Sequence, residues 1–228
     1  MTATGSTGTL NVTFGNVGSD AVPFATGNGN TTVAGGDAAD VITVTGLATA
    51  SQTFTGSVAK FNITAGAGAQ TIVTGAGADT ITGGAGGDII NGGTGNDTYI
   101  ISHPTNDTGL VAASSNSATS TVALDVITVT AGDKIDLTLS LGTDANYVNV
   151  VTTPATAYTA YTGLATTTVY EVRGAYSSSG ATFTPGDSGA DVLLYWASAD
   201  GTTADQQIVL VGTGSVADTI AGGILTIA

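Results

Sequence analysis

Three aspartates occupy the same position of a repeat within a glycine-rich stretch of this chain. Asp79, Asp88 and Asp97 are each the sixth residue of a nine-residue unit whose eighth residue is large and apolar. Residues 83–100, for example, read GGAGGDIIN and GGTGNDTYI. Glycine loses more backbone freedom on folding than any other residue, so a turn this rich in glycine needs a compensating interaction. Carboxylates repeated at one position of such a backbone predict a bound cation.

The donor set favours calcium among the common metal ions. Glycines let a six-residue turn direct its carbonyl oxygens inward, and the sixth-position aspartate adds a carboxylate. Ca²⁺ takes six to eight oxygen ligands at about 2.3–2.6 Å, whereas Mg²⁺ demands a stricter octahedron. Zinc and copper would need His or Cys, and the chain has one His and no Cys. Aspartates also form turns without a metal, but stacked carboxylates would then repel one another.

The repeat predicts short strands that alternate with tight turns. Four units follow in register from residue 65, and two further units at residues 26–34 and 35–43 share a register with each other, while residues 44–55 interrupt the pattern. Such dense glycine excludes a helix. Stacked coils would bury their eighth-position side chains in one continuous core. Those side chains are Val33, Ile42, Ile63, Ile72, Ile81, Ile90 and Tyr99.

Because nine residues make half a coil, units two apart should share an edge. Asp97 is therefore predicted to stack on Asp79 in the best site, and Asp88 on the neutral donor Gln70 in a weaker one. A further coil would bring Asn106 or Asp107 to Asp88. We expect about two to four calcium ions. The candidate ligands are the carboxylates of Asp37, Asp40, Asp79, Asp88 and Asp97, the amide of Gln70, and the turn backbone at Gly75, Gly77, Gly84, Gly86, Gly93 and Gly95.

The rest of the chain predicts an all-β protein in four parts. Residues 1–25 are expected to form strands that lead into a parallel β-roll at 26–102, and Ser/Thr/Asn-rich residues 103–124 form a linker or loop. Residues 125–228 contain β-branched and alternating apolar runs, which predict an antiparallel, sandwich-like cap. Tyr195 and Trp196 lie in one such run and are expected in its core.

Charge and hydropathy exclude several classes of partner. The net charge is −14, with three basic residues against 17 acidic ones, which opposes binding to nucleic acid. No run approaches the roughly 20 apolar residues of a membrane span. The N-terminus lacks the basic and apolar regions of a Sec-type signal peptide.

The nine-residue units resemble the RTX (repeats-in-toxin) motif, closely over 65–100 and fairly over 26–43. The resemblance implies a β-roll that is disordered without Ca²⁺, and secretion through a type I ABC exporter by means of an uncleaved C-terminal signal. Residues 124–140, LDVITVTAGDKIDLTLS, resemble the stretch that follows the roll in serralysin-type proteases, although the usual phenylalanine before the glycine is missing. Residues 191–212 resemble the closing hairpins of those proteases.

No catalytic motif accompanies the repeats, so we expect a non-enzymatic protein. There is no H-E-x-x-H, and His103 stands alone before a proline. Asp133 and Asp136 lie on opposite faces of an expected strand, which favours a turn, a bond to Lys134 or a calcium ligand over acid–base catalysis.

The composition resembles bacterial surface-layer (S-layer) proteins exported by type I systems. That resemblance implies the C-terminal part of an S-layer protein, which assembles with copies of itself into a lattice at the cell surface. The alternatives are the secretion module of an RTX adhesin and the tail of a secreted protease or lipase.

Overall fold

The computed structural model is all-β, as the sequence predicts. Every complete element in its described part is a strand, and no helix there is long and apolar enough to cross a membrane. The described residues are 10–14, 21–25, 31–35, 41–45, 52–55, 58, 60–66, 69–84, 87–101, 118–119, 125–138, 146–149, 168–179, 182–186, 189–197, 204–213 and 220–228.

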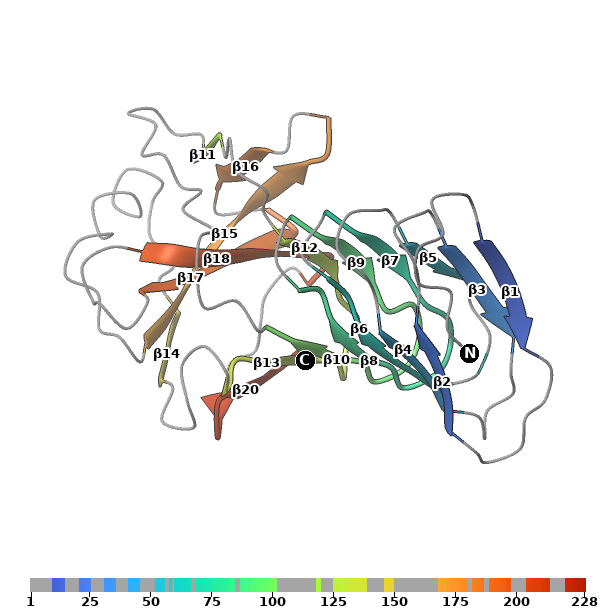
Figure 1. The fold of residues 1–228 in the computed structure, drawn as a ribbon. Coiled ribbons are helices and arrows are strands. Elements are labelled where there is room, and N and C mark those ends of the chain that lie inside the picture. The colour runs from blue at the N-terminus through green and yellow to red at the C-terminus, as the bar shows by residue number, and fades with distance from the viewer. Residues whose placement is uncertain are drawn as a thin grey trace.

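Successive parallel strands lie alternately on the two faces of a roll. A strand therefore pairs with the strands two places away from it in the sequence, not with its immediate neighbours (Figure 1). One face contains β2 Ala21–Ala25, β4 Val41–Thr45, β6 Lys60–Thr64, β8 Thr80–Thr82, β10 Thr98–Ile100 and β13 Lys134–Asp136. The other contains β1 Leu10–Phe14, β3 Thr31–Gly35 and β5 Gln52–Thr55 in one sheet, and β7 Thr71–Val73, β9 Ile89–Asn91 and β12 Asp125–Thr128 in another.

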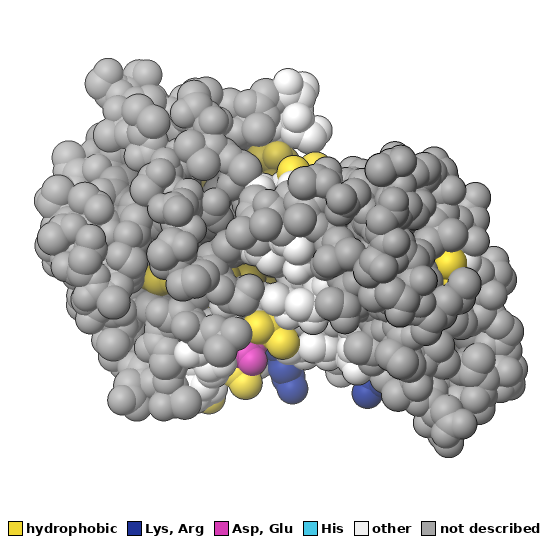
Figure 2. Space-filling view, in the orientation of Figure 1, with side chains coloured by type: hydrophobic (Ala, Val, Ile, Leu, Met, Phe, Trp, Pro, Cys, Tyr) yellow, Lys and Arg dark blue, Asp and Glu magenta, His cyan; other side chains and the backbone are white. Residues whose placement is uncertain are grey.

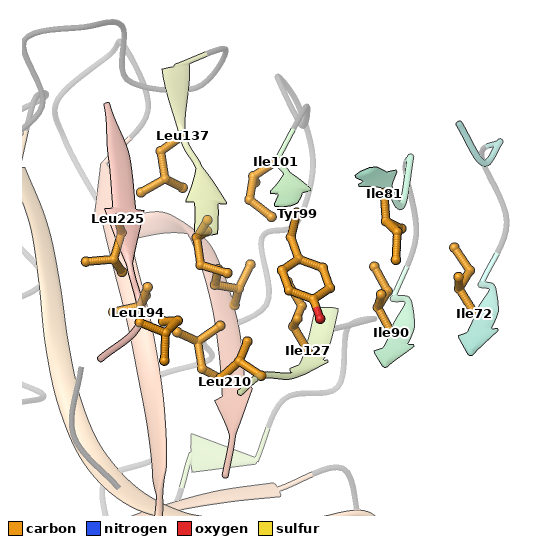
Figure 3. Packing of buried hydrophobic residues seen from close by; sticks show 14 of the residues in the cluster. Ile72, Ile81, Ile90, Tyr99, Ile101, Ile127, Leu137, Leu194, Leu210 and Leu225 are labelled. Atoms are coloured by element: carbon orange, nitrogen blue, oxygen red, sulfur yellow. The ribbon is translucent and has the colours of Figure 1, made fainter. Parts of the chain in front are cut away.

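Each repeat strand is short because only its central residue needs to be buried. In β8 the sequence is Thr-Ile-Thr, with Ile81 fully buried and both threonines half-buried. β-Branched side chains favour this extended backbone. The inward residues then stack in register on both faces, as Figure 3 shows for several of them. The two columns are Ile63–Ile81–Tyr99–Ile135 and Ile72–Ile90–Ile127.

The roll extends through residues that the sequence pattern assigned elsewhere. Residues 44–55 were expected to interrupt the repeat, but β4 runs to Thr45, and β5 pairs in parallel with β3. The N-terminal strands are four or five residues long rather than three, so a fixed period of nine could not follow them. β1 and β2, from the part expected only to lead into the roll, pair in parallel with β3 and β4.

The C-terminal part continues both faces of the roll. β12 and β13 were predicted within an antiparallel region, but they pair in parallel with β9 and β10. Beyond them, β18 pairs with β12 and β20 pairs with β13. We call the strands after β13, together with β11, the cap. They are β11 Ala118–Thr119, β14 Asn146–Asn149, β15 Thr168–Ser177, β16 Thr182–Pro185, β17 Asp191–Ala197, β18 Ala204–Val211, β19 Ile220–Ala221 and β20 Ile224–Thr226.

The predicted antiparallel character holds for most of the cap, where β16, β15, β17 and β18 are successive antiparallel neighbours. β17 is apolar at every buried position because both of its faces are covered. Leu194 and Trp196 face a core shared with the roll, whereas Leu193 and Tyr195 belong to a second cluster. Trp196 and Tyr195 are therefore core residues, as expected.

Candidate calcium site in the repeat turns

The sixth-position carboxylates form two ladders on opposite edges of the roll. On the first edge, the backbone N–H of Asp79 donates to Oδ1 of Asp97 at 2.8 Å. On the second, the N–H of Gln70 donates to Oδ1 of Asp88 at 2.7 Å. Both pairs are units two apart, so the structure brings together the residues that the half-coil geometry predicts. We call these lines of turns the Asp79 edge and the Asp88 edge.

Two further aspartates extend these ladders beyond the repeats. The N–H of Asp97 donates to Oδ1 of Asp133 at 2.8 Å, and the N–H of Asp88 donates to Oδ1 of Asp125 at 2.9 Å. Asp125 therefore takes the place that the sequence analysis offered to Asn106 or Asp107, which lie outside the described residues together with Asp37, Asp40 and Gly86.

Sequence reasoning offered Asp133 as a possible calcium ligand but did not place it in a ladder, and it did not single out Asp125, although a signal was present. Each precedes an inward isoleucine by two residues, Ile127 and Ile135, just as Asp88 precedes Ile90. The Asp-x-apolar triplet marks the rung even where the glycines that define the repeat are missing.

The Asp79 edge contains carboxylate oxygens that the protein does not satisfy. Asp79 and Asp97 are 1% and 0% exposed, and within the described residues the Oδ2 atom of each has no hydrogen-bond partner. Figure 2 shows few acidic side chains among the described residues of the face that it presents. A buried anionic oxygen without a donor is strongly unfavourable. A cation bound between the turns would remove that penalty.

Main-chain oxygens lie beside these carboxylates. Gly93 has a φ of 87°, and a Cβ built on it would overlap the carbonyl oxygen of Gly75 in the turn below. Gly95, with φ 142°, stands in the same relation to the carbonyl oxygen of Gly77. Only glycine allows this approach, and the approach brings carbonyl oxygens of one turn against the next.

These donors fit calcium better than a transition metal. The described residues contain no group of three or more His, Cys, Asp or Glu side chains that could hold a metal. The ion would therefore be held by few carboxylates and several carbonyls, a hard oxygen set that suits Ca²⁺. On the Asp79 edge the holding residues would be Asp79 and Asp97 with the backbone of Gly75, Gly77, Gly93 and Gly95.

Comparison with known families supports the same ion. Residues 64–99 match the model of the RTX calcium-binding nonapeptide repeat in four copies. The chain carries RTX calcium-binding repeats. A search of curated proteins gave no match to this chain. Calcium is the ion that RTX repeats bind, and proteins that contain them are typically secreted.

The electrostatics of the RTX turns follow from burial. Burial, together with the negative charges of Asp133 and Asp79, raises the pKa of Asp97 to about 7, although the N–H of Asp79 acts in the opposite direction. Burial likewise raises the pKa of Asp79. Without a cation, these carboxyls are easier to bury as the neutral acid.

We therefore predict that the pH dependence of stability reverses when calcium is bound. In metal-free buffer, a carboxyl whose folded pKa exceeds its unfolded value of 3.8 stabilises the fold at low pH and loses that effect as pH rises through about 7. Between pH 5 and 8 the free energy of unfolding should fall by about 3 kcal/mol from Asp97 alone. With saturating calcium it should rise with pH, because protons compete for the ligands.

Thermal melts at several pH values, with and without calcium, test this reversal. Asp97→Asn is the matched control, because the change removes the titrating group but keeps a side chain of the same shape. The metal-free slope should flatten in this variant. Equal slopes in the variant and the parent chain would show that general charge repulsion, rather than Asp97, causes the dependence.

Proposed function

We propose that this chain is a non-catalytic, secreted structural protein whose fold is ordered by calcium outside the cell. The observation that carries the proposal is the continuity of the sheets. β9 pairs with β12, which pairs with β18, and β10 pairs with β13, which pairs with β20. Roll and cap also share one hydrophobic core. Ions held between RTX turns would therefore stabilise the cap as well as the repeats.

A bound calcium ion would supply positive charge beside the carboxylates, and the chain supplies the geometry. The backbone N–H of Phe61 donates to Oδ1 of Asp79 at 2.8 Å, and the N–H of Asp79 donates to Oδ1 of Asp97 at 2.8 Å. These two bonds fix both carboxyl groups. The Thr74 hydroxyl donates to the carbonyl of Gly92 at 2.7 Å, and the N–H of Thr94 to that of Gly75 at 2.8 Å. These bonds set the separation of the two turns.

Linkage explains why such a protein would fold only after export through a type I ABC exporter. Each site contributes RT ln(1 + [L]/Kd) to stability, about 1.4 kcal/mol when calcium is at ten times Kd. A chain whose metal-free melting temperature lies near the temperature of the cell would stay loose there while calcium is scarce, and would fold where calcium is abundant.

The surroundings of Asp133 and Asp136 support the absence of catalysis by this pair. The Asp133 oxygens accept hydrogen bonds from the backbone of Asp97 and from Thr130, and the Asp136 oxygen from Thr138. Side chains held in this way shape turns, and they are poorly placed to exchange protons with a substrate.

Within this function we favour the C-terminal part of an S-layer protein. The low proportion of charged residues, the lack of Cys, and the abundance of Thr, Ala and Gly support it. Electron microscopy of purified protein should then reveal ordered sheets with calcium and none after chelation. A calcium-folded chain that stays monomeric at high concentration would refute the lattice, and would favour the tail of an RTX adhesin or a secreted hydrolase.

A further inference from the structure

The carboxylate ladder on the Asp79 edge ends at Asp133, and the surroundings of this last aspartate differ from those of the others. Oδ2 of Asp133 accepts hydrogen bonds from the N–H of Thr130 at 2.7 Å and from its hydroxyl at 3.3 Å. The corresponding Oδ2 atom of Asp97 has no such partner in the described part of the chain. At Asp133, therefore, protein donors bind the carboxylate oxygen that in the RTX turns could bind a cation.

The turn that holds Asp133 is also bonded to Ile227, the residue that follows β20. The N–H of Gly132 donates to the carbonyl of Ile227 at 2.9 Å, and the N–H of Ile227 donates to the carbonyl of Asp133 at 2.8 Å. Both bonds involve the backbone and need no ion.

The side chain of Asn96, from the last RTX turn, lies against this turn. Gly132 has a φ of 96°, and a Cβ built on it would overlap Oδ1 of Asn96 in the turn below. The Asn96 amide thus packs against the Gly132 backbone, so the two turns are in direct contact at this point.

We propose that Asp133 is the metal-free end of the calcium ladder and that it positions Asp97 for the last calcium on this edge. Asp133 acts through its Oδ1, which accepts the N–H of Asp97 at 2.8 Å and so fixes the backbone from which the Asp97 carboxylate projects. This proposal rests on calcium binding by the RTX turns, and it makes Asp133 a positioning residue and not a ligand.

The first test counts calcium ions by titration calorimetry in the parent chain, Asp97→Asn and Asp133→Asn. Asp97→Asn should bind one ion fewer than the parent. Asp133→Asn should bind the same number as the parent, with the last site about tenfold weaker, because the amide turns a donor toward Thr130 or loses its bond to Asp97. Loss of one ion in Asp133→Asn would make Asp133 a ligand and overturn the proposal.

The second test separates positioning from general destabilisation. Leu225 pairs opposite Ile135 on β20 and is buried, and its side chain belongs to the hydrophobic core rather than to the ladder. Leu225→Val or Leu225→Ala, whichever matches the melting temperature of Asp133→Asn without calcium, is the control. In the Asp97→Asn background, Asp133→Asn should no longer weaken binding at the remaining sites more than this control does.

If Asp133→Asn still weakens calcium binding more than the Leu225 control does in the Asp97→Asn background, the positioning role is refuted. If Asp133→Asn does not fold, Thr130→Val takes its place, since it keeps the Thr130 N–H and removes only the hydroxyl; it should keep the calcium count and weaken the last site by a smaller factor. Failure of the parent chain to bind any calcium would instead refute the proposed function.

Discussion

Removal of calcium should lower the melting temperature of this chain by roughly 6–12 °C or more. Two or more linked sites at ten times Kd contribute at least about 3 kcal/mol, and each kcal/mol moves the melting temperature of a chain of this size by roughly 2–4 °C. The stacked Asp79 and Asp97 carboxylates add repulsion once the ion leaves. Circular dichroism and calorimetry in calcium and in excess EGTA measure the shift.

Magnesium at the same concentration is the control for ionic strength and for divalent charge in general. It should restore little of the lost stability, because it accepts an irregular set of carbonyl ligands poorly. Unchanged melting in EGTA, together with no calcium in the titration, would contradict the calcium-ordered fold.

The same experiment tests whether roll and cap form one cooperative unit. Trp196 is buried in the cap, where its core is shared with the repeat strands. Its fluorescence should therefore follow the same transition as the circular dichroism signal, and both should move when calcium is removed. A calcium-independent fluorescence transition would show that the cap folds separately, despite the continuous sheets.

The parts of the fold that followed from the sequence are those with a fixed period. The stacking of Asp97 on Asp79 and of Asp88 on Gln70 required only a nine-residue unit and two faces. The N-terminal rungs could not be predicted because their strands, such as the five-residue β4, are separated by unequal numbers of residues. There the pairing of whole strands, rather than a glycine motif, keeps the register.

The strand order of the cap could not be predicted, for a different reason. Alternating apolar runs such as residues 191–197 predicted strands but not their order, since strand order depends on which side chains fill the open end of the roll. β17 is buried on both faces, so its sequence carries no alternation that would indicate a side. The rungs of Asp125 and Asp133 lack the paired glycines, and the inward residues Ile127 and Ile135 are their only sign in the sequence.

The second large effect should come from Gly93→Ala. The residue has a φ of 87°, which costs an alanine about 1–2 kcal/mol. The new Cβ would also overlap the Gly75 carbonyl oxygen, which belongs to the backbone and cannot rotate away. Together these effects should destabilise the calcium-bound fold by about 2–5 kcal/mol. They should also push apart the two turns that hold an ion, so one calcium should be lost.

Two other glycines separate the contributions of backbone strain and steric overlap. Gly222 has a φ of 60° with nothing near its built Cβ, so Gly222→Ala should cost only the strain, about 1–2 kcal/mol. Gly186 has open space and no positive φ, so Gly186→Ala should be close to neutral. Calorimetric melts and calcium titrations of the three variants give the comparison. If Gly93→Ala cost no more than Gly222→Ala and kept every calcium ion, the close approach of the turns could not be what builds the site.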